Sequence, residues 1–117
     1  MKKKKILWLS RHEPLRCQIE FLKQAFGAVE IRRDINPFKS AEDIAERFKS
    51  GDYDDLVVVA PLSVIDRLTK LEIYPLWADM KQVERSDYHD LAYRGRYYKF
   101  AGIRRVKSVR MEFFEGI

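Results

Sequence analysis

Three adjacent polar residues, Ser10, Arg11 and His12, directly follow the apolar run 6–9 and are the residues of this sequence best suited to chemistry. A guanidinium binds a phosphate through two parallel hydrogen bonds, and an imidazole that titrates near neutrality can transfer a proton. A serine hydroxyl can donate a further hydrogen bond. Each residue also has a structural explanation, as a helix cap, an ion-pair partner and an exposed loop residue. Taken together, they favour an anion-binding site.

The elements that would position these residues alternate between strand and helix. Continuous apolar runs predict buried strands, and apolar residues spaced three and four apart predict amphipathic helices. Pro14 and Pro61 suit first helical turns, and Gly27 suits a helix end. We expect strands over 5–9, 29–34, 56–60 and 76–80, and helices over 15–26, 40–51 and 61–71.

This alternation predicts an α/β fold, since right-handed crossovers through helices produce parallel strands. We expect one domain over 1–117, a small Rossmann-like three-layer unit whose mainly parallel sheet has a strand order near 2-1-3-4. The parallel core would cover 5–83, with a C-terminal β extension over 84–117. That extension would contain a basic hairpin that turns at Gly95 and an alternating, half-exposed strand over 108–113.

In such a sheet, ligands bind beyond the carboxyl ends of the strands, where the strand order reverses. We expect the loop after the first strand to face the loop after the third strand there. Two helix N-termini would then point into one crevice and attract an anion. The predicted ligand-binding residues are Ser10, Arg11, Pro61, Leu62 and Ser63, and the candidate catalytic residues are Ser10, Arg11 and His12. Asp54 and Asp55 would be solvated loop charges at the opposite end of the sheet.

The net charge of +5 is concentrated in residues 94–110, a segment that has no carboxylate. Tyrosines lie between its cations, a combination that suits single-stranded nucleic acid because bases stack on aromatic rings. In the alternative interpretation, the rings pack inward or across a dimer interface, and the cations keep an edge strand exposed to water. The candidate nucleic-acid-binding residues are Arg94, Arg96, Tyr97, Lys99, Arg104, Arg105, Lys107 and Arg110.

Other classes of function have little support. The sequence contains no glycine-rich nucleotide loop and no His/Cys spacing typical of a metal site, so we expect neither cofactor nor metal. One cysteine, Cys17, cannot form an internal disulfide, which favours a reducing compartment. The lysine run 2–5 precedes too few apolar residues for a signal peptide, and the sequence has no membrane span. We therefore expect a cytoplasmic protein.

Two short motifs resemble the small CRISPR-associated ring nucleases, compact Rossmann-like proteins that bind and cleave cyclic oligoadenylates. The first motif is the strand that runs into Trp8-Leu9-Ser10-Arg11-His12, where Glu13 separates the histidine from the family's proline. The second is the apolar strand that leads into a proline-containing helix start, Val57-Val58-Val59-Ala60-Pro61-Leu62. The resemblance covers roughly residues 5–80.

The resemblance implies a metal-independent reaction in which a ribose 2′-hydroxyl attacks its own phosphodiester and leaves a 2′,3′-cyclic phosphate. Arg11 would stabilise the charge on the phosphorane, His12 would act as general acid or base, and Ser10 and Ser63 would orient the phosphate. Two-fold symmetry of a cyclic ligand favours a homodimer. Two alternatives from other classes are a nucleic-acid-binding accessory protein and a dimeric protein-interaction module.

Overall fold

The computed structural model describes residues 3–117, so the first lysine of the run 2–5 lies outside the described residues. These residues fold into a six-stranded mixed sheet and three helices. The strands are β1 (Lys4–Leu9), β2 (Val29–Asp34), β3 (Asp55–Val58), β4 (Leu76–Val83), β5 (Leu91–Tyr93) and β6 (Arg96–Arg105). The helices are α1 (Arg16–Phe26), α2 (Ala41–Ser50) and α3 (Leu62–Lys70). No helix among residues 3–117 combines the length and apolarity that a membrane crossing requires.

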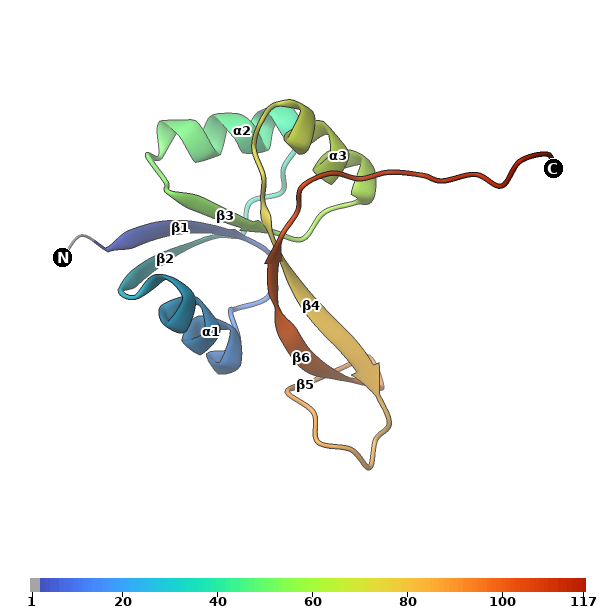
Figure 1. The fold of residues 1–117 in the computed structure, drawn as a ribbon. Helices are drawn as coiled ribbons and strands as arrows, with labels where there is room; N and C mark the ends of the chain where they lie inside the picture. Colours follow the sequence, from blue (N-terminus) through green and yellow to red (C-terminus); the bar gives the residue numbers. More distant parts are fainter. Residues whose placement is uncertain (1–2) are drawn as a thin grey trace.

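The full strand order is β2-β1-β3-β4-β6-β5, which differs from the expected 2-1-3-4 order because the two strands of the expected C-terminal hairpin, β5 and β6, join the same sheet beside β4. β1 pairs in parallel with β2 along its whole length and with β3 over Ile6–Leu9, whereas β3 and β4 share the single residue pair Val57–Leu76. β4 then pairs with β6 up to Val83, three residues beyond its expected end at 80. Figure 1 shows β4, β6 and β5 as an arm that leaves the β1–β3 part of the sheet. This antiparallel pairing explains why β4 is longer than its apolar run.

Helices cover both faces of the sheet: α1 lies on one side, and α2 and α3 lie on the other (Figure 1). Leu7, Leu56 and Val58 pack with the helices α2 and α3. Residues of β1 and β3 with the opposite orientation, Trp8 and Val57, pack with α1 and the arm. Alternate residues of a strand point to opposite faces, so each central strand contributes to both halves of the core.

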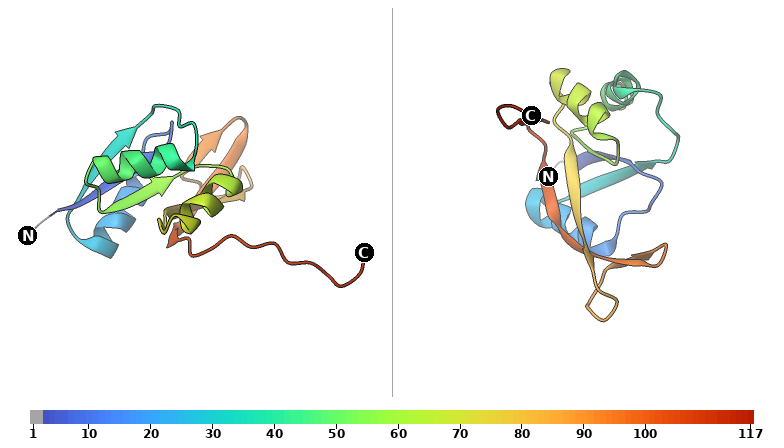
Figure 2. Two further views of the ribbon diagram at one scale, coloured as in Figure 1. Left: turned by 90° about the horizontal axis from the view of Figure 1, so that it is seen from above. Right: turned by 90° about the vertical axis from the view of Figure 1, so that its right-hand side faces the viewer.

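The C-terminal segment corrects one expectation. Residues 108–113 were expected to form a strand because their apolar residues alternate, but residues 106–114 have no regular secondary structure. Val106 and Val109 pack against the α2/α3 side of the core. Beyond them the chain runs away from the body of the protein (Figure 2), and Met111 and Phe113 are exposed. A strand needs a neighbouring backbone to pair with as well as a pattern. After β6 the N–H of Val106 donates to the carbonyl of Pro75, and residues 107–114 form no ladder with any described strand.

Asp55 corrects a second expectation, since it is not a solvated loop charge. It begins β3, and its side chain is only 5% exposed. Arg105 at the end of β6 donates to both of its carboxylate oxygens, over 2.9 Å and 2.7 Å. Lys4 Nζ lies 3.4 Å from the same carboxylate. A buried carboxylate therefore fastens the end of the arm to the central strands.

Candidate functional site

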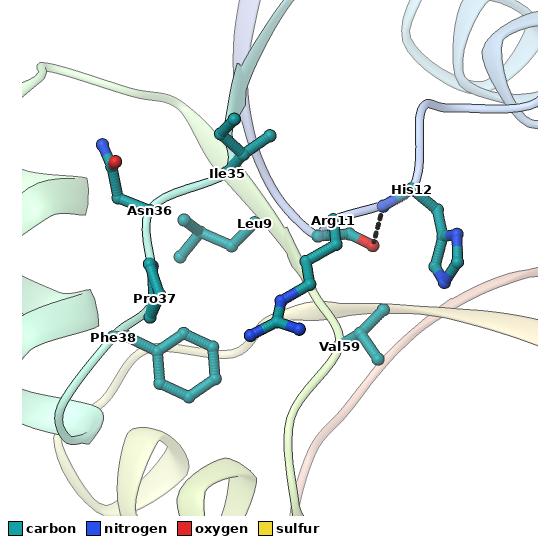
Figure 3. Close-up of a pocket in the computed structure, with 9 residues that line it drawn as sticks. Leu9, Arg11, His12, Ile35, Asn36, Pro37, Phe38 and Val59 are labelled. Atoms are coloured by element: carbon teal, nitrogen blue, oxygen red, sulfur yellow. Dashed lines mark hydrogen bonds between the residues drawn. The ribbon is translucent and has the colours of Figure 1, made fainter.

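A pocket of about 350 Å³ opens where β1, β2 and β3 end (Figure 3). The carboxyl ends of parallel strands meet at one edge, so loops that are distant in the sequence converge there. The lining residues are Leu9, Ser10, Arg11, His12, Ile35, Asn36, Pro37, Phe38 and Val59. The fold thus gathers the three polar residues expected to bind an anion at one pocket.

Arg11 supplies the positive charge of this pocket. Its side chain points between Phe38 and Val59 in Figure 3, and it is exposed. Within residues 3–117, its guanidinium has no hydrogen-bond or ion-pair partner, whereas its backbone carbonyl accepts a hydrogen bond from the Arg33 guanidinium. The loop is therefore held in place while the charged group of Arg11 stays free to bind a carboxylate or phosphate through two N–H groups.

The backbone of the same loop is fixed by two further hydrogen bonds. Ser10 Oγ accepts from the backbone N–H of His12 over 3.2 Å (Figure 3). The indole N–H of the buried Trp8 donates to the carbonyl of His12 over 3.1 Å. Ser10 thus has a structural role within its own loop and not as a helix cap, since Leu15 is the N-cap residue of α1. Its hydroxyl hydrogen remains available to a ligand.

His12 points away from the guanidinium of Arg11 (Figure 3). Its ring packs edge-on against Tyr93 of β5, with ring centroids 5.1 Å apart and an interplanar angle of 85°. Proton transfer requires the ring to reach a reacting oxygen inside the pocket. In this structure the imidazole instead joins the pocket loop to the hairpin of β5 and β6, so Arg11 and His12 do not converge on one point.

The wall opposite Arg11, residues 35–38 after β2, was not among the predicted site residues. Arg47 of α2 holds this wall by donating to the carbonyls of Asn36 and Pro37, over 2.9 Å and 2.8 Å. The same guanidinium bonds the carboxylate of Asp43. The sequence did contain a signal for this wall. The expected strand over 29–34 runs parallel to the first strand, so both must end at the same edge of the sheet. The Asn36-Pro37 break directly after it therefore lies beside the loop of Arg11.

The two helix N-termini expected at the crevice do not line the pocket, since α1 begins at Arg16 and α3 at Leu62, both outside its lining. The N-terminus of α2 lies nearer, just after residues 35–38, but its charge is already met. Ser40 caps α2 by accepting from the N–H of Asp43, and Glu42 and Asp43 already neutralise its first turn. The backbone N–H of Lys39, and then the Arg47 guanidinium, lowers the pKa of Asp43, so this carboxylate stays ionised. The anion affinity of the pocket therefore depends on Arg11.

The loop after β3 does not complete the pocket as expected. Val59, outside β3 and exposed, lines the pocket, whereas Pro61, Leu62 and Ser63 lie beyond it. Leu62 begins α3 and lines a separate hollow with Trp77 and residues 104–110. The structure thus brings Ser10, Arg11 and His12 together with the loop after β2, and it places residues 61–63 elsewhere.

The basic C-terminal segment is divided by its own contacts. Arg105 pairs with Asp55, Arg104 pairs with Asp79 over 2.7 Å, and Arg94 lies over the Tyr93 ring at 5.2 Å. The remaining cations of the segment have no ion-pair partner among residues 3–117: Arg96, Lys99, Lys107 and Arg110. Tyr97 packs against the His89 ring, with centroids 4.7 Å apart. Because alternate residues of β6 face opposite sides, the segment is not one continuous basic strip.

Cys17 is half-buried on α1, and burial, followed by the charge of Asp90, raises its thiol pKa. The thiolate is the reactive form, so little of it forms at neutral pH. We expect Cys17 to react with iodoacetamide more slowly than a free cysteine at pH 7.5, and its rate to keep rising above pH 9. A pH series of alkylation rates, read by mass spectrometry, checks this. A rate plateau below pH 8 would contradict it.

No group of three or more potential metal ligands occurs in the part of the chain that the structure describes. Comparison with protein-family models, curated proteins and solved structures finds no match to this chain. The geometry of the pocket therefore carries the functional argument.

Proposed function

We propose that this chain binds a phosphate-bearing, RNA-like ligand at the pocket formed after β1, β2 and β3. Cyclic oligoadenylate is the leading ligand class, with other RNA-like phosphodiesters as the alternative. The observation that carries the proposal is the free guanidinium of Arg11, which points into a pocket with apolar walls. The resemblance of residues 8–12 to the ring-nuclease loop supports the choice of ligand. We also propose that the parallel strands form a Rossmann-like fold, as in that family.

The two parts of the pocket suit the two parts of a nucleotide. Arg11 can bind phosphate oxygens through parallel N–H groups. Phe38, Ile35 and Val59 provide an apolar surface for a base, and both Ile35 and Val59 are more than half exposed without a ligand. A volume of about 350 Å³ is at the small end of the range for ligand pockets. One pocket therefore fits one nucleotide unit, and a cyclic ligand would use a pocket from each chain of a homodimer.

The geometry supports binding more strongly than cleavage. Cleavage by a 2′-hydroxyl requires a group that accepts its proton, and the candidate for that role is His12. Its ring packs against Tyr93 and would have to leave that contact to reach a phosphodiester in the pocket. We therefore propose that the protein binds its ligand. In an extended form of the proposal it also cleaves the ligand as a metal-independent ring nuclease, and the experiment below distinguishes binding alone from binding with cleavage.

The test is calorimetric titration of the protein with cyclic tetra-adenylate in EDTA. Arg11→Ala is expected to weaken binding by about tenfold or more, because the charge-assisted hydrogen bonds to phosphate are lost. His12→Ala is expected to bind within about twofold of the wild type, since its ring lies outside the phosphate position. Equal affinity of Arg11→Ala and wild type would overturn the proposal.

The matched control is Arg16→Ala. It removes the same charge from an exposed residue of α1 whose partner is Glu20 on the same helix. We expect it to leave the affinity unchanged. Chromatography of the titrated ligand then separates the two forms of the proposal, since a 2′,3′-cyclic phosphate product that disappears in His12→Ala would establish cleavage.

A further inference from the structure

We propose a second binding site, for single-stranded nucleic acid, on the open face of the arm, centred on Lys81 of β4 and Lys99 of β6. This site is separate from the pocket at Arg11 and does not depend on the function proposed for that pocket. Lys81 lies outside the basic segment 94–110, so only the pairing of β4 with β6 shows that it is a neighbour of Lys99.

The two lysines are directly opposite each other in the β4–β6 ladder. Like charges at directly opposed positions destabilise a sheet, so this arrangement weakens the arm. Both residues are exposed, and neither has an ion-pair partner among residues 3–117. The neighbouring opposite charges on the same ladder, Asp79 and Arg104, are paired at 2.7 Å. Lys81 and Lys99 therefore form a pair of adjacent cations, on neighbouring strands, that no carboxylate among residues 3–117 neutralises.

The face that carries these lysines is left open by the helices. On the other face, α1 covers the arm: the Phe21 and Phe100 rings lie 5.7 Å apart, and Gln18 contacts the sulfur of Met80. Lys99 neighbours Phe100 in β6 and so points away from α1. On the α2 and α3 side, Trp77 is the last arm residue that packs against the core, so the rest of that face is uncovered (Figure 1).

The lysines border a hollow whose lining includes Val83, Ala101 and Tyr88. Tyr88 is 74% exposed, its hydroxyl donates to Asp90 Oδ1 over 3.0 Å, and it also borders the start of α1, so its ring stands at the edge of the arm. One carboxylate, Asp87, also lines it, but its Oδ2 atom accepts the backbone N–H of Glu84 over 3.2 Å.

Cations beside an exposed aromatic ring suit a ligand that offers phosphates and unpaired bases together. Bases stack on aromatic rings, and lysines follow the backbone charge, without a requirement for sequence. A duplex would keep its bases stacked internally, and an acidic peptide would leave the Tyr88 ring unused. The geometry therefore favours single-stranded nucleic acid as the occupant.

The test measures fluorescence anisotropy of a labelled oligouridylate with the full chain. Lys99→Glu is expected to reduce affinity by about tenfold or more at low salt, because one phosphate contact is replaced by repulsion. The same substitution places Glu opposite Lys81, so it is expected to raise the thermal midpoint. A purely structural role for Lys99 would not move binding and stability in opposite directions.

The matched control is Lys23→Glu, which makes the same charge change at an exposed residue of α1 and is expected to keep the affinity within about twofold. The double variant Lys81→Ala, Lys99→Ala gives a second measurement. Its affinity should depend less steeply on salt, with the log–log slope reduced by about 1.4. Unchanged affinity in Lys99→Glu overturns the site, as does an equal loss in Lys23→Glu. Binding that is lost only in Arg11→Ala would place the nucleic acid in the pocket instead.

Discussion

Replacing Arg105 with alanine is expected to lower the free energy of unfolding by about 3 kcal/mol, because it leaves a buried carboxylate without its main partner. Both oxygens of Asp55 accept hydrogen bonds from Arg105, and the Asp55 side chain is 5% exposed. Lys4, at 3.4 Å, remains as a partial counter-charge. Urea denaturation, with the midpoint and slope compared between variant and wild type, measures the loss.

Arg104→Ala is the matched control one residue away. Arg104 is 77% exposed and pairs with Asp79 at the surface, so its loss is expected to cost about 0–1 kcal/mol. A double-mutant cycle with Asp55→Asn then isolates the pair, since Arg105→Ala should cost much less once the charge of Asp55 is gone. If Arg104→Ala and Arg105→Ala are equally destabilising, the buried pair does not fasten the arm.

Arg47→Ala is expected to lower the free energy of unfolding by about 2 kcal/mol, since the carbonyls of Asn36 and Pro37 each lose a hydrogen-bond donor. The same change releases the pocket wall, so the affinity for cyclic tetra-adenylate should fall as well. Denaturation and calorimetry on one preparation measure both effects. Arg47→Lys should recover little of either, because an ammonium cannot reproduce the planar fork of donors.

Arg67→Ala serves as the control for this prediction. Arg67 lies on the neighbouring helix α3 and pairs with Glu42 over 2.7 Å, but both side chains are more than half exposed. Its loss should change neither the unfolding curve nor ligand affinity to a comparable degree. An Arg47→Ala variant as stable and as active in binding as Arg67→Ala would refute the role assigned to the wall.

The elements that the sequence predicted correctly are those whose signal is local. Leu15, Ile19, Leu22 and Phe26 have helical spacing, and the chain forms α1 over Arg16–Phe26. The apolar run 56–60 contains most of β3. Parallel pairing of these strands through helical crossovers followed from the alternation, and the structure confirms the α/β class with a mostly parallel sheet. Such features depend on residues close together in the chain.

What the sequence did not reveal depends on partners that are far apart. Asp55 looked like loop charge because its partner, Arg105, lies 50 positions away. The segment 108–113 has the alternation of a strand, but it pairs with no strand among the described residues. The same limit applies to the site. The position of Arg11 at the carboxyl edge of the sheet could be predicted from the sequence. The direction of the His12 ring could not, because it depends on a contact with the distant Tyr93.

The single residue pair between β3 and β4 has a mechanical consequence. One backbone residue pair does not hold the β1–β3 part of the sheet and the arm rigidly together, so side-chain contacts must link the two parts. One of those links is the His12 ring against Tyr93. Two others are the Phe21 ring of α1 against Phe100 and the Arg105–Asp55 ion pair. The attachment of the outer strands to the rest of the molecule therefore rests on side-chain contacts more than on shared backbone hydrogen bonds.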